Sequence, residues 1–373
     1  MMQFIDLSRQ QMIIREKIEL RIKKVLNSGK YIMGPEIVEL EEKLADYVGI
    51  QHCITCSSGT DALLMPLMAQ GIGKGDAVIT TPFTFIATAE VIKLVGATPV
   101  FVDICEDTFN INPAGIPDAI EYAKNQGLKP KAIIPVDLFG LPAPYAEIEK
   151  TSAENGLFVL EDAAQGFGGE ISRRKAGLFG HVAATSFFPA KPLGCYGDGG
   201  AVFTSDDDLA HILRSIRVHG GGADKYDNVR VGINGRLDTL QAAVLLEKLD
   251  IFPGEVLRRN RAAEYYTKNL PAGFRAPIVP ENYLSSWAQY SILLETSQDR
   301  GRVIKKLKEQ NIPAMIYYKI PLHLQKVFDY LGYEKGDFPV SEKTSENILS
   351  IPMHPYIKTS EQDKILETLH AAA

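Results

Sequence analysis

Short apolar runs alternate with helical patterns over the first part of the chain. Apolar residues spaced three and four apart predict one helix that ends at Asn27 and a second over 35–48, each followed by a stopping glycine. Strands are then predicted around Cys53 and at 77–80, 98–102, 131–136, 157–160, 182–188 and 201–204, and helices at 62–69, 84–95, 113–125, 144–155 and 206–218. This alternation predicts a mostly parallel central sheet covered by helices, that is, an α/β fold.

The pattern changes after a predicted helix at 237–252. Helical (256–270), strand-like (287–294) and helical (302–310) segments follow, and they predict a smaller α+β part. At 373 residues the chain is also long for a single small core. We therefore expect a large domain over residues 1–252 and a small C-terminal domain over residues 253–373.

Composition and charge narrow the class of protein. Hydrophobic residues make up 45% and charged residues 23%, which is typical of a folded globular protein. The net charge of −6 argues against nucleic acid or an anionic membrane surface as a partner. The chain shows no signal peptide and no run of about 18 apolar residues, so we expect a cytoplasmic protein without a membrane span.

The four cysteines are too few for a disulfide scaffold in a chain of this size. Cys53 and Cys56 have the CxxC spacing, but they fall on a predicted strand, where positions three apart face opposite sides. No second CxxC or nearby histidine pair completes a zinc site. We expect buried thiols and no metal.

One lysine differs from the others in its surroundings. Lys191 follows the apolar run 182–188 and precedes four glycines, which would let a ligand approach the backbone closely. A lysine partly removed from water loses some of its preference for the ammonium form and becomes a candidate Schiff-base nucleophile. A lysine that extends its amine from a sheet edge into solvent is the alternative, and the local pattern does not separate the two.

A pyridoxal phosphate (PLP) enzyme needs a lysine, an anion hole, a carboxylate for the pyridine nitrogen and a flat group over the ring. Residues 57–60 lie between a strand and a helix, where free N–H groups would bind a phosphate, although an ordinary N-cap is the alternative. Asp162 follows the strand 157–160, at the sheet edge where ligands bind, and its carboxylate would keep the pyridine nitrogen protonated. A capping aspartate is the alternative there.

Three more residues complete the predicted cofactor site. Ser186 could add a hydroxyl to the phosphate contacts, and Gln165 could donate to the ring oxygen. Phe85, at a strand-to-helix turn, is the candidate for the flat group, although a phenylalanine packed in the core is the default expectation. The candidate residues follow successive strands of the predicted sheet, and together they predict a PLP site.

Several motifs together resemble the nucleotide-sugar aminotransferases of the DegT/StrS group, which are PLP enzymes of fold type I. The motifs are 34–36, 57–63, 82–88, 161–165, the Lys191 segment and 232–238, and the likeness covers nearly the whole chain. The cofactor contacts that this resemblance implies are Gly59, Thr60, Phe85, Asp162, Gln165, Ser186, Lys191 and Asn234. Such enzymes are homodimers, in which Asn234 would reach the partner's cofactor phosphate; a plain turn at Asn234-Gly235 is the alternative.

Within this group, the likeness is to members that aminate C3 of a UDP-linked 3-keto-N-acetylhexosaminuronic acid. It is carried by segments 189–200, 236–243 and 353–356. In those relatives an arginine that matches Arg236 meets the sugar carboxylate, and a His-Tyr pair lies near the sugar. Here the pair reads Tyr317-Tyr318, followed by Lys319 where a proline is usual. The substrate contacts implied are Arg236, Tyr317, Tyr318 and His323.

The resemblance implies that the chain moves an amino group from L-glutamate to a UDP-linked keto-sugar, for a surface polysaccharide such as lipopolysaccharide O-antigen. One alternative is an aminotransferase for a 3- or 4-keto-6-deoxy sugar nucleotide. Another is a PLP-binding sensor or regulatory protein without catalysis. Sugar dehydratases of the same fold carry histidine in place of the lysine, so Lys191 argues against that activity.

Overall fold

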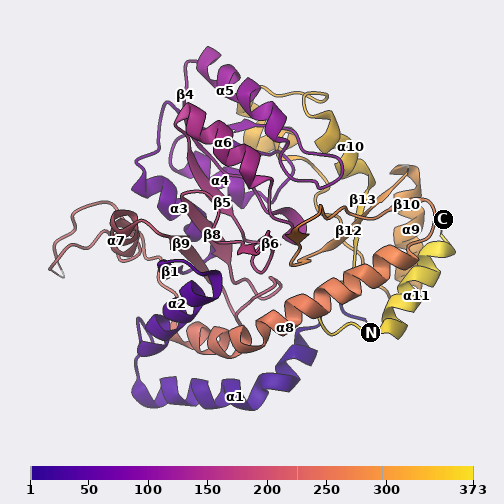
Figure 1. Cartoon of the computed structure of the whole chain (residues 1–373), viewed down its shortest axis with the longest axis horizontal. Helices are drawn as coiled ribbons and strands as arrows, with labels where there is room; N and C mark the ends of the chain where they lie inside the picture. Colours follow the sequence, from indigo (N-terminus) through magenta and orange to yellow (C-terminus); the bar gives the residue numbers. More distant parts are fainter. Residues whose placement is uncertain (1, 225, 296, 373) are drawn as a thin grey trace.

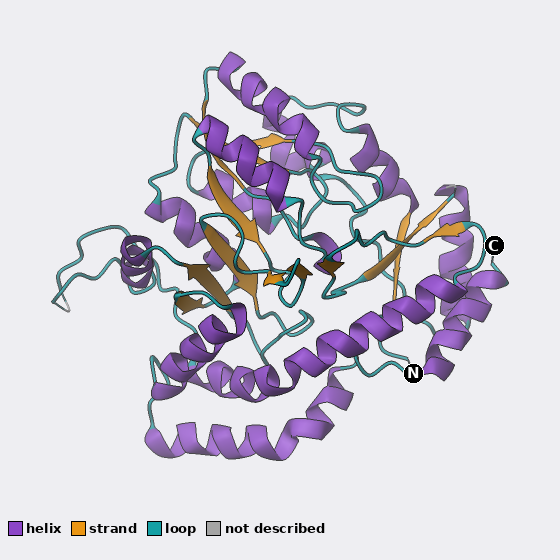
Figure 2. Ribbon diagram, in the orientation of Figure 1, coloured by secondary structure: helices purple, strands orange, loops and turns teal. Residues whose placement is uncertain are grey.

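The computed structural model describes residues 2–224, 226–295 and 297–372. Its centre is a seven-stranded sheet of order β1-β9-β8-β5-β4-β2-β3, with helices on both faces (Figures 1 and 2). The strands are β1 (His52–Cys56), β2 (Asp76–Thr80), β3 (Thr98–Phe101), β4 (Lys129–Ile133), β5 (Phe158–Asp162), β8 (Val182–Ser186) and β9 (Gly200–Thr204). Neighbouring strands are parallel except at β9, which runs antiparallel to both β1 and β8. The predicted, mostly parallel sheet is confirmed.

Alternating side chains of the strands enter the cores on the two faces of this sheet. One face packs against α3 (Gly59–Ala69), α4 (Ala87–Leu94) and α7 (Asp207–Ile216), and the other against α2 (Pro35–Val48), α5 (Ile116–Asn125) and α6 (Tyr145–Asn155). Cys53 packs on the α2 side and Cys56 on the α3 side, as their spacing on a strand predicts. All four cysteines are free.

Glycine and proline set the ends of the first helices as the sequence predicts. Gly29 caps the C-terminus of helix α1 (Leu7–Ser28), and Gly49 caps that of α2, which begins with Pro35. Both glycines have positive φ. Helix α4 begins only at Ala87, three residues later than predicted. The residues before it therefore form a turn between β2 and α4, which contains Phe85.

The prediction of two helices at 237–252 and 256–270 is wrong, because one helix, α8 (Thr239–Asn269), runs for 31 residues through both. Pro253 lies inside it, and a proline there is unfavourable by about 3 kcal/mol. Phe252 and Val256 are buried in one core on either side of Pro253, and this packing keeps the helix continuous. The boundary at 252/253 falls within α8, and the division into two domains stays a prediction.

The C-terminal part contains an antiparallel three-stranded sheet, β10-β12-β13. It consists of β10 (Phe274–Arg275), β12 (Tyr290–Leu294) and β13 (Ile348–Ile351), near α9 (Ser297–Glu309), α10 (Pro339–Asn347) and α11 (Thr359–His370). Three two-residue strands, β6 (Glu170–Ile171), β7 (Arg174–Lys175) and β11 (Tyr283–Leu284), form a third sheet. In the part of the chain described here, no helix is long and apolar enough to cross a membrane.

Candidate active site

Lys191 lies on the loop after β8 and is half-buried. Its backbone N–H donates to the Phe188 carbonyl at 2.9 Å, and the buried Lys248 Nζ donates to the Gly194 carbonyl at 2.6 Å, which holds the loop against α8. Burial lowers the pKa of the Lys191 ammonium, and the nearby Asp162 carboxylate partly opposes this shift. The structure therefore places Lys191 among desolvated lysines rather than solvated ones.

Asp162 ends β5 and is almost fully buried. Its Oδ2 accepts a hydrogen bond from Thr88 Oγ1 at 2.8 Å, and its Oδ1 accepts one from the Ala164 N–H at 3.2 Å. Burial raises the pKa of this carboxyl, while these two donors and the Lys191 charge lower it. An acid held in this way, beside a desolvated amine, forms the polar centre of the candidate site.

Sequence reasoning gave no role to Thr88 or Thr84. Thr88 Oγ1 lies 3.2 Å from Thr84 Oγ1, so the two buried hydroxyls form a short chain that ends on Asp162. A signal was present, because two threonines one helical turn apart in an apolar segment need polar partners when they are buried. Only the fold shows that the partner is Asp162.

The predicted phosphate contacts come together at the start of α3. Gly59 is the first residue of that helix, and the Ser58 side chain before it accepts from the Asp61 N–H at 3.1 Å. The N–H groups of Gly59 and Thr60 lie in the first turn, where the helix itself offers no acceptor. A Cβ on Gly59 would lie 2.5 Å from Cβ of Ser186, so its backbone packs directly on that serine. The segment is thus both capped and able to bind an anion.

Gln165 is buried and uses both ends of its side-chain amide. Its Oε1 accepts from the Phe139 N–H at 2.8 Å, and its Nε2 donates to the Tyr318 hydroxyl at 3.0 Å. An amide nitrogen carries two hydrogens, so one remains for a ring oxygen. Tyr318, predicted as a substrate contact, therefore lies against a predicted cofactor contact. Tyr317 is half-buried beside it, and Lys319 is exposed.

The two phenylalanines of the turn before α4 have opposite surroundings. Phe83 is 0% exposed and belongs to a hydrophobic core, whereas 55% of Phe85 is exposed. The default expectation of a core phenylalanine thus describes Phe83. Phe85 is exposed, and its predicted role as the flat group over the cofactor ring stays a prediction.

The structure does not bring His323 to the surface of the site. The side chain is buried, its Nε2 lies 3.0 Å from Glu342 Oε1, and its ring packs edge-on against Phe338. Burial lowers the pKa of His323. An imidazole in this position has almost no exposed surface to offer a sugar, and its predicted role as a substrate contact stays a prediction.

Asn234 and Arg236 lie together on the segment between α7 and α8, where the Gly235 N–H donates to the Arg217 carbonyl at 3.0 Å. Arg236 Nε donates to Asn234 Oδ1 at 2.9 Å, on the surface. Between them, the Gly235 carbonyl accepts from the Ser57 N–H at 3.0 Å, which puts this segment beside the phosphate contacts of its own chain. The predicted reach of Asn234 to a partner subunit stays a prediction.

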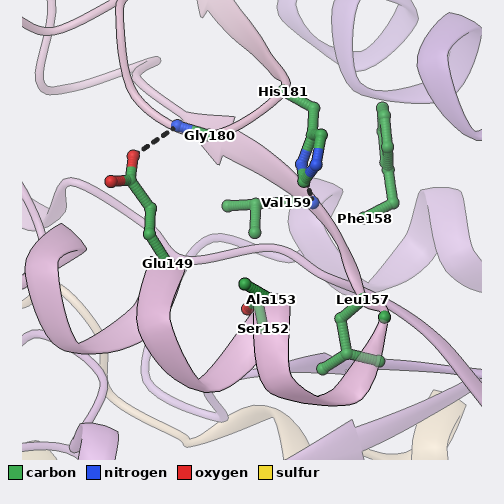
Figure 3. A pocket seen from close by; sticks show the side chains of 9 residues that line it. Glu149, Ser152, Ala153, Leu157, Phe158, Val159, Gly180 and His181 are labelled. Carbon is green, nitrogen blue, oxygen red and sulfur yellow. Dashed lines mark hydrogen bonds between the residues drawn. The ribbon is translucent and has the colours of Figure 1, made fainter.

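A hollow lies elsewhere, at the amino ends of the central strands. Figure 3 shows it between α6 and the starts of β5 and β8, where Glu149 accepts from the Gly180 N–H at 3.0 Å. Lys191 follows the carboxyl end of β8, and Asp162 is the last residue of β5. Since ligands of parallel sheets bind at the carboxyl ends of the strands, this hollow is not the candidate active site.

The model of the DegT/DnrJ/EryC1/StrS aminotransferase family matches residues 12–370. The chain belongs to this family. It is 46% identical to a UDP-2-acetamido-2-deoxy-3-oxo-D-glucuronate aminotransferase of Pseudomonas aeruginosa, over 96% of this chain and 97% of that one.

Two solved structures extend the comparison. A DegT/DnrJ/EryC1/StrS aminotransferase from Brucella abortus has a TM-score of 0.96 and 51% identity, with 100% of this chain and 99% of that one covered. NtdA from Bacillus subtilis with bound cofactor PMP has a TM-score of 0.88 and 30% identity, with coverages of 99% and 83%. The fold is that of a fold-type I aminotransferase, as predicted.

The residues described above fit the PLP that enzymes of this family use. The close packing of Gly59 on Ser186 and the free first turn of α3 suit a phosphate. The buried Asp162 carboxyl suits a pyridine nitrogen, and Lys191 is a partly desolvated amine beside it. The chain is therefore a PLP-dependent sugar aminotransferase, as the sequence predicts.

Proposed function

We propose that this aminotransferase moves the amino group of L-glutamate to C3 of a UDP-linked 2-acetamido-2-deoxy-3-keto-hexuronic acid. We further propose that it acts in the cytoplasm as a homodimer with shared sites, in the synthesis of a surface polysaccharide such as O-antigen. The similarity to the Pseudomonas aeruginosa enzyme supports the sugar class. The observation that carries the proposal is Arg236, whose hydrogen-bond partner is the neutral Asn234 side chain.

The guanidinium of Arg236 suits the carboxylate of a uronate. Among the described residues, no carboxylate forms an ion pair with Arg236, although its fork can bind a carboxylate through two hydrogen bonds. The C6 carboxylate of a hexuronic acid offers that partner, whereas a 6-deoxy sugar presents a methyl group there. The exposed Lys319 could be a second cation or an ordinary surface residue, and its solvation favours the surface role.

The residues of the site then have separate tasks. When bound, PLP supplies an electron sink that stabilises negative charge at the reacting carbon. Gly59 and Thr60 N–H groups and the Ser186 hydroxyl would hold its phosphate, and Phe85 would cover its ring. Asp162, oriented by Thr88, would keep the ring nitrogen protonated. Burial raises the neutral fraction of Lys191, so that Nζ can take a proton from glutamate and later return one to the sugar.

The Lys191→Ala variant tests the catalytic assignment. We expect it to lose the formation of 2-oxoglutarate from glutamate and the visible absorption of the enzyme-bound cofactor. A Lys175→Met variant is a useful control, because Lys175 is also half-buried and its amine donates to the Tyr47 carbonyl rather than to the loop of Lys191. If Lys191→Ala retained both turnover and the visible absorption, the assignment of Lys191 would be wrong.

The Arg236→Ala variant tests the substrate. A hydrogen bond to a charged group is worth about 1.5–3 kcal/mol, so KM for the uronate should rise by roughly ten- to 150-fold. The glutamate half-reaction should change much less, and Arg236→Lys should be intermediate because it keeps the charge without the fork. A wild-type kcat/KM higher for a 4-keto-6-deoxy sugar nucleotide than for the uronate would refute the proposed substrate.

The shared site can be tested by mixing two inactive chains. If Arg236 acts across a dimer, a Lys191→Ala chain and an Arg236→Ala chain should together recover activity, because each heterodimer contains one intact site. Subunit exchange must be shown separately, for example with tagged chains. Exchange without any recovery would count against a site shared through Arg236.

A further inference from the structure

A ring of hydrogen bonds ties the turn 57–60, here called the phosphate turn, to the segment that carries Asn234 and Arg236. Its members are Glu41 of α2, Thr55 of β1, Arg217 at the end of α7, and the backbones of Gly235 and Ser57. The ring contains one ion pair, whose two residues are 176 positions apart in the sequence. The chemistry proposed above gives this ion pair no part.

The ion pair joins Arg217 and Glu41 beside the end of β1. Arg217 Nη1 donates to Glu41 Oε1 at 2.5 Å, and only 5% of the arginine side chain and 15% of the glutamate side chain are exposed. Both partners also hold the buried Thr55. Its N–H and Oγ1 donate to Glu41 Oε1 at 2.8 and 2.7 Å, and its carbonyl accepts from Arg217 Nη1 at 2.9 Å. The pair thus fixes Thr55 two residues before the phosphate turn.

The backbone of Arg217 holds the second segment. Its carbonyl accepts from the Gly235 N–H at 3.0 Å, and the Gly235 carbonyl accepts from the Ser57 N–H at 3.0 Å. The residue after Arg217 also pairs with Asn234 in an isolated antiparallel β-bridge. Because Thr55 and Ser57 are two residues apart on one chain, these bonds close the ring. A displacement of Arg217 would therefore shift both the phosphate turn and Asn234.

Stability alone is a poor explanation for this ion pair. Arg217 Nε is buried and has no hydrogen-bond partner in the described part of the chain. Taking two charges out of water costs about as much free energy as their attraction returns, and apolar side chains of similar volume often stabilise a fold equally well. A geometric role, in which the rigid fork of the guanidinium holds two segments at a fixed spacing, explains the pair better.

We propose that the ion pair of Glu41 and Arg217 is a positioning element, which fixes the phosphate turn relative to the segment that carries Arg236. The geometric effect stands on the hydrogen bonds of the ring alone. Its effect on PLP binding rests on the proposed phosphate contacts of Gly59 and Thr60. Its effect on the sugar rests on the proposed role of Arg236.

The first experiment measures the ring by hydrogen exchange and mass spectrometry of the PLP-loaded enzyme. In Arg217→Met, peptides that contain Ser57 or Gly235 should exchange faster than in the wild type, because the acceptors of both N–H groups are no longer held in place. The matched control is Arg300→Met, since Arg300 is a half-buried arginine whose Nη1 donates to the Ser345 carbonyl at 2.5 Å in the C-terminal part. It should leave both peptides unchanged. Wild-type exchange in Arg217→Met would overturn the proposal.

A double variant keeps the test valid if the single substitution does not fold. Arg217→Met leaves the Glu41 carboxylate without its cation, and removal of one partner of a buried pair is strongly destabilising. The double variant Glu41→Gln/Arg217→Met removes both charges, and the glutamine oxygen can still accept from Thr55. Where the single variant fails to fold, the double variant replaces it in every measurement, with the same expected results.

The second experiment measures cofactor affinity by titration of the cofactor-free enzyme with PLP. Outer residues that orient metal ligands are typically worth about ten- to a hundredfold in affinity, and we expect a similar rise in the Kd for PLP in Arg217→Met. Arg217→Lys should recover part of the affinity, because it keeps a cation for Glu41, and Arg300→Met should bind PLP like the wild type. Faster exchange with an unchanged Kd would overturn the positioning role, as would a higher Kd with unchanged exchange.

The third experiment separates this proposal from the proposed function. At saturating PLP, KM for the uronate should rise in Arg217→Met, because Arg236 lies on the displaced segment, whereas KM for glutamate should change little. If Arg236→Ala itself leaves KM for the uronate unchanged, the proposed substrate contact is wrong, and the exchange and PLP measurements still decide the role of the ring. A raised KM in Arg236→Ala together with a wild-type KM in Arg217→Met would contradict the positioning of Arg236 by the ring.

Discussion

The hydroxyl of Thr88 allows a sharp test of the cofactor site, because valine replaces threonine at nearly the same size. In Thr88→Val, Asp162 loses the donor that lies 2.8 Å from its Oδ2. A hydrogen bond to a charged group is worth about 1.5–3 kcal/mol, or roughly ten- to 150-fold in affinity. Asp162 keeps the Ala164 N–H and the Lys191 charge, so we expect PLP binding to weaken by about tenfold.

The assay is a titration of the cofactor-free enzyme with PLP, followed by visible absorption. Thr88→Ser should restore most of the affinity, because it returns the hydroxyl. Thr80→Val is the matched control, since Thr80 is equally buried and its hydroxyl donates to the Ile134 carbonyl at 2.8 Å, on another strand pair. It should lower stability slightly and leave the affinity unchanged.

Two results would refute this reasoning. Equal PLP affinities in Thr88→Val and the wild type would show that the hydroxyl does not support Asp162. An equal loss in Thr80→Val would show that any buried hydroxyl of the sheet has the same effect. The role of Thr88 would then be structural.

Three further predictions follow from single contacts. Gly59→Ala should weaken PLP binding strongly, because its Cβ would lie 2.5 Å from Ser186, and the same titration measures it. Tyr318→Phe should raise the Kd for PLP severalfold, since Gln165 loses the hydroxyl 3.0 Å from its Nε2, with Tyr317→Phe as the control. Burial lowers the pKa of His354 from 6.5 to about 4, so stability should be lost as pH falls from about 6.5 to 4, by about 3 kcal/mol. The free energy of unfolding of the wild type and of His354→Gln, measured with denaturant from about pH 6.5 to 4, checks this. The same pH dependence in both proteins would contradict it.

Local pattern was enough to predict much of the fold and the centre of the candidate site. The central sheet and most of its helices follow from apolar runs and their glycine and proline boundaries. Lys191 follows the buried strand β8 and Asp162 is the last residue of β5, and the carboxyl ends of parallel strands lie on the same side of a sheet. Their proximity is therefore a consequence of topology that a sequence can show.

What could not be predicted depends on contacts between distant segments. Thr88 donates to an acid 74 positions away, and Gln165 donates to the Tyr318 hydroxyl 153 positions away. His323 carries no local sign that Glu342 buries it. The continuity of α8 through Pro253 comes from the packing of side chains before and after the proline, which outweighs the local preference for a break.

Helix α8 also determines how the molecule can move. Its 31 residues span about 46 Å as a single rod. Near one end Lys248 holds the loop of Lys191, and farther along Arg259 donates to the Trp287 carbonyl at 3.0 Å in the C-terminal part. A rod anchored on both sides resists bending, so a jaw-like closure about residue 252 would have to break these anchors. A closure that keeps both hydrogen bonds in place would have to come from segments outside α8.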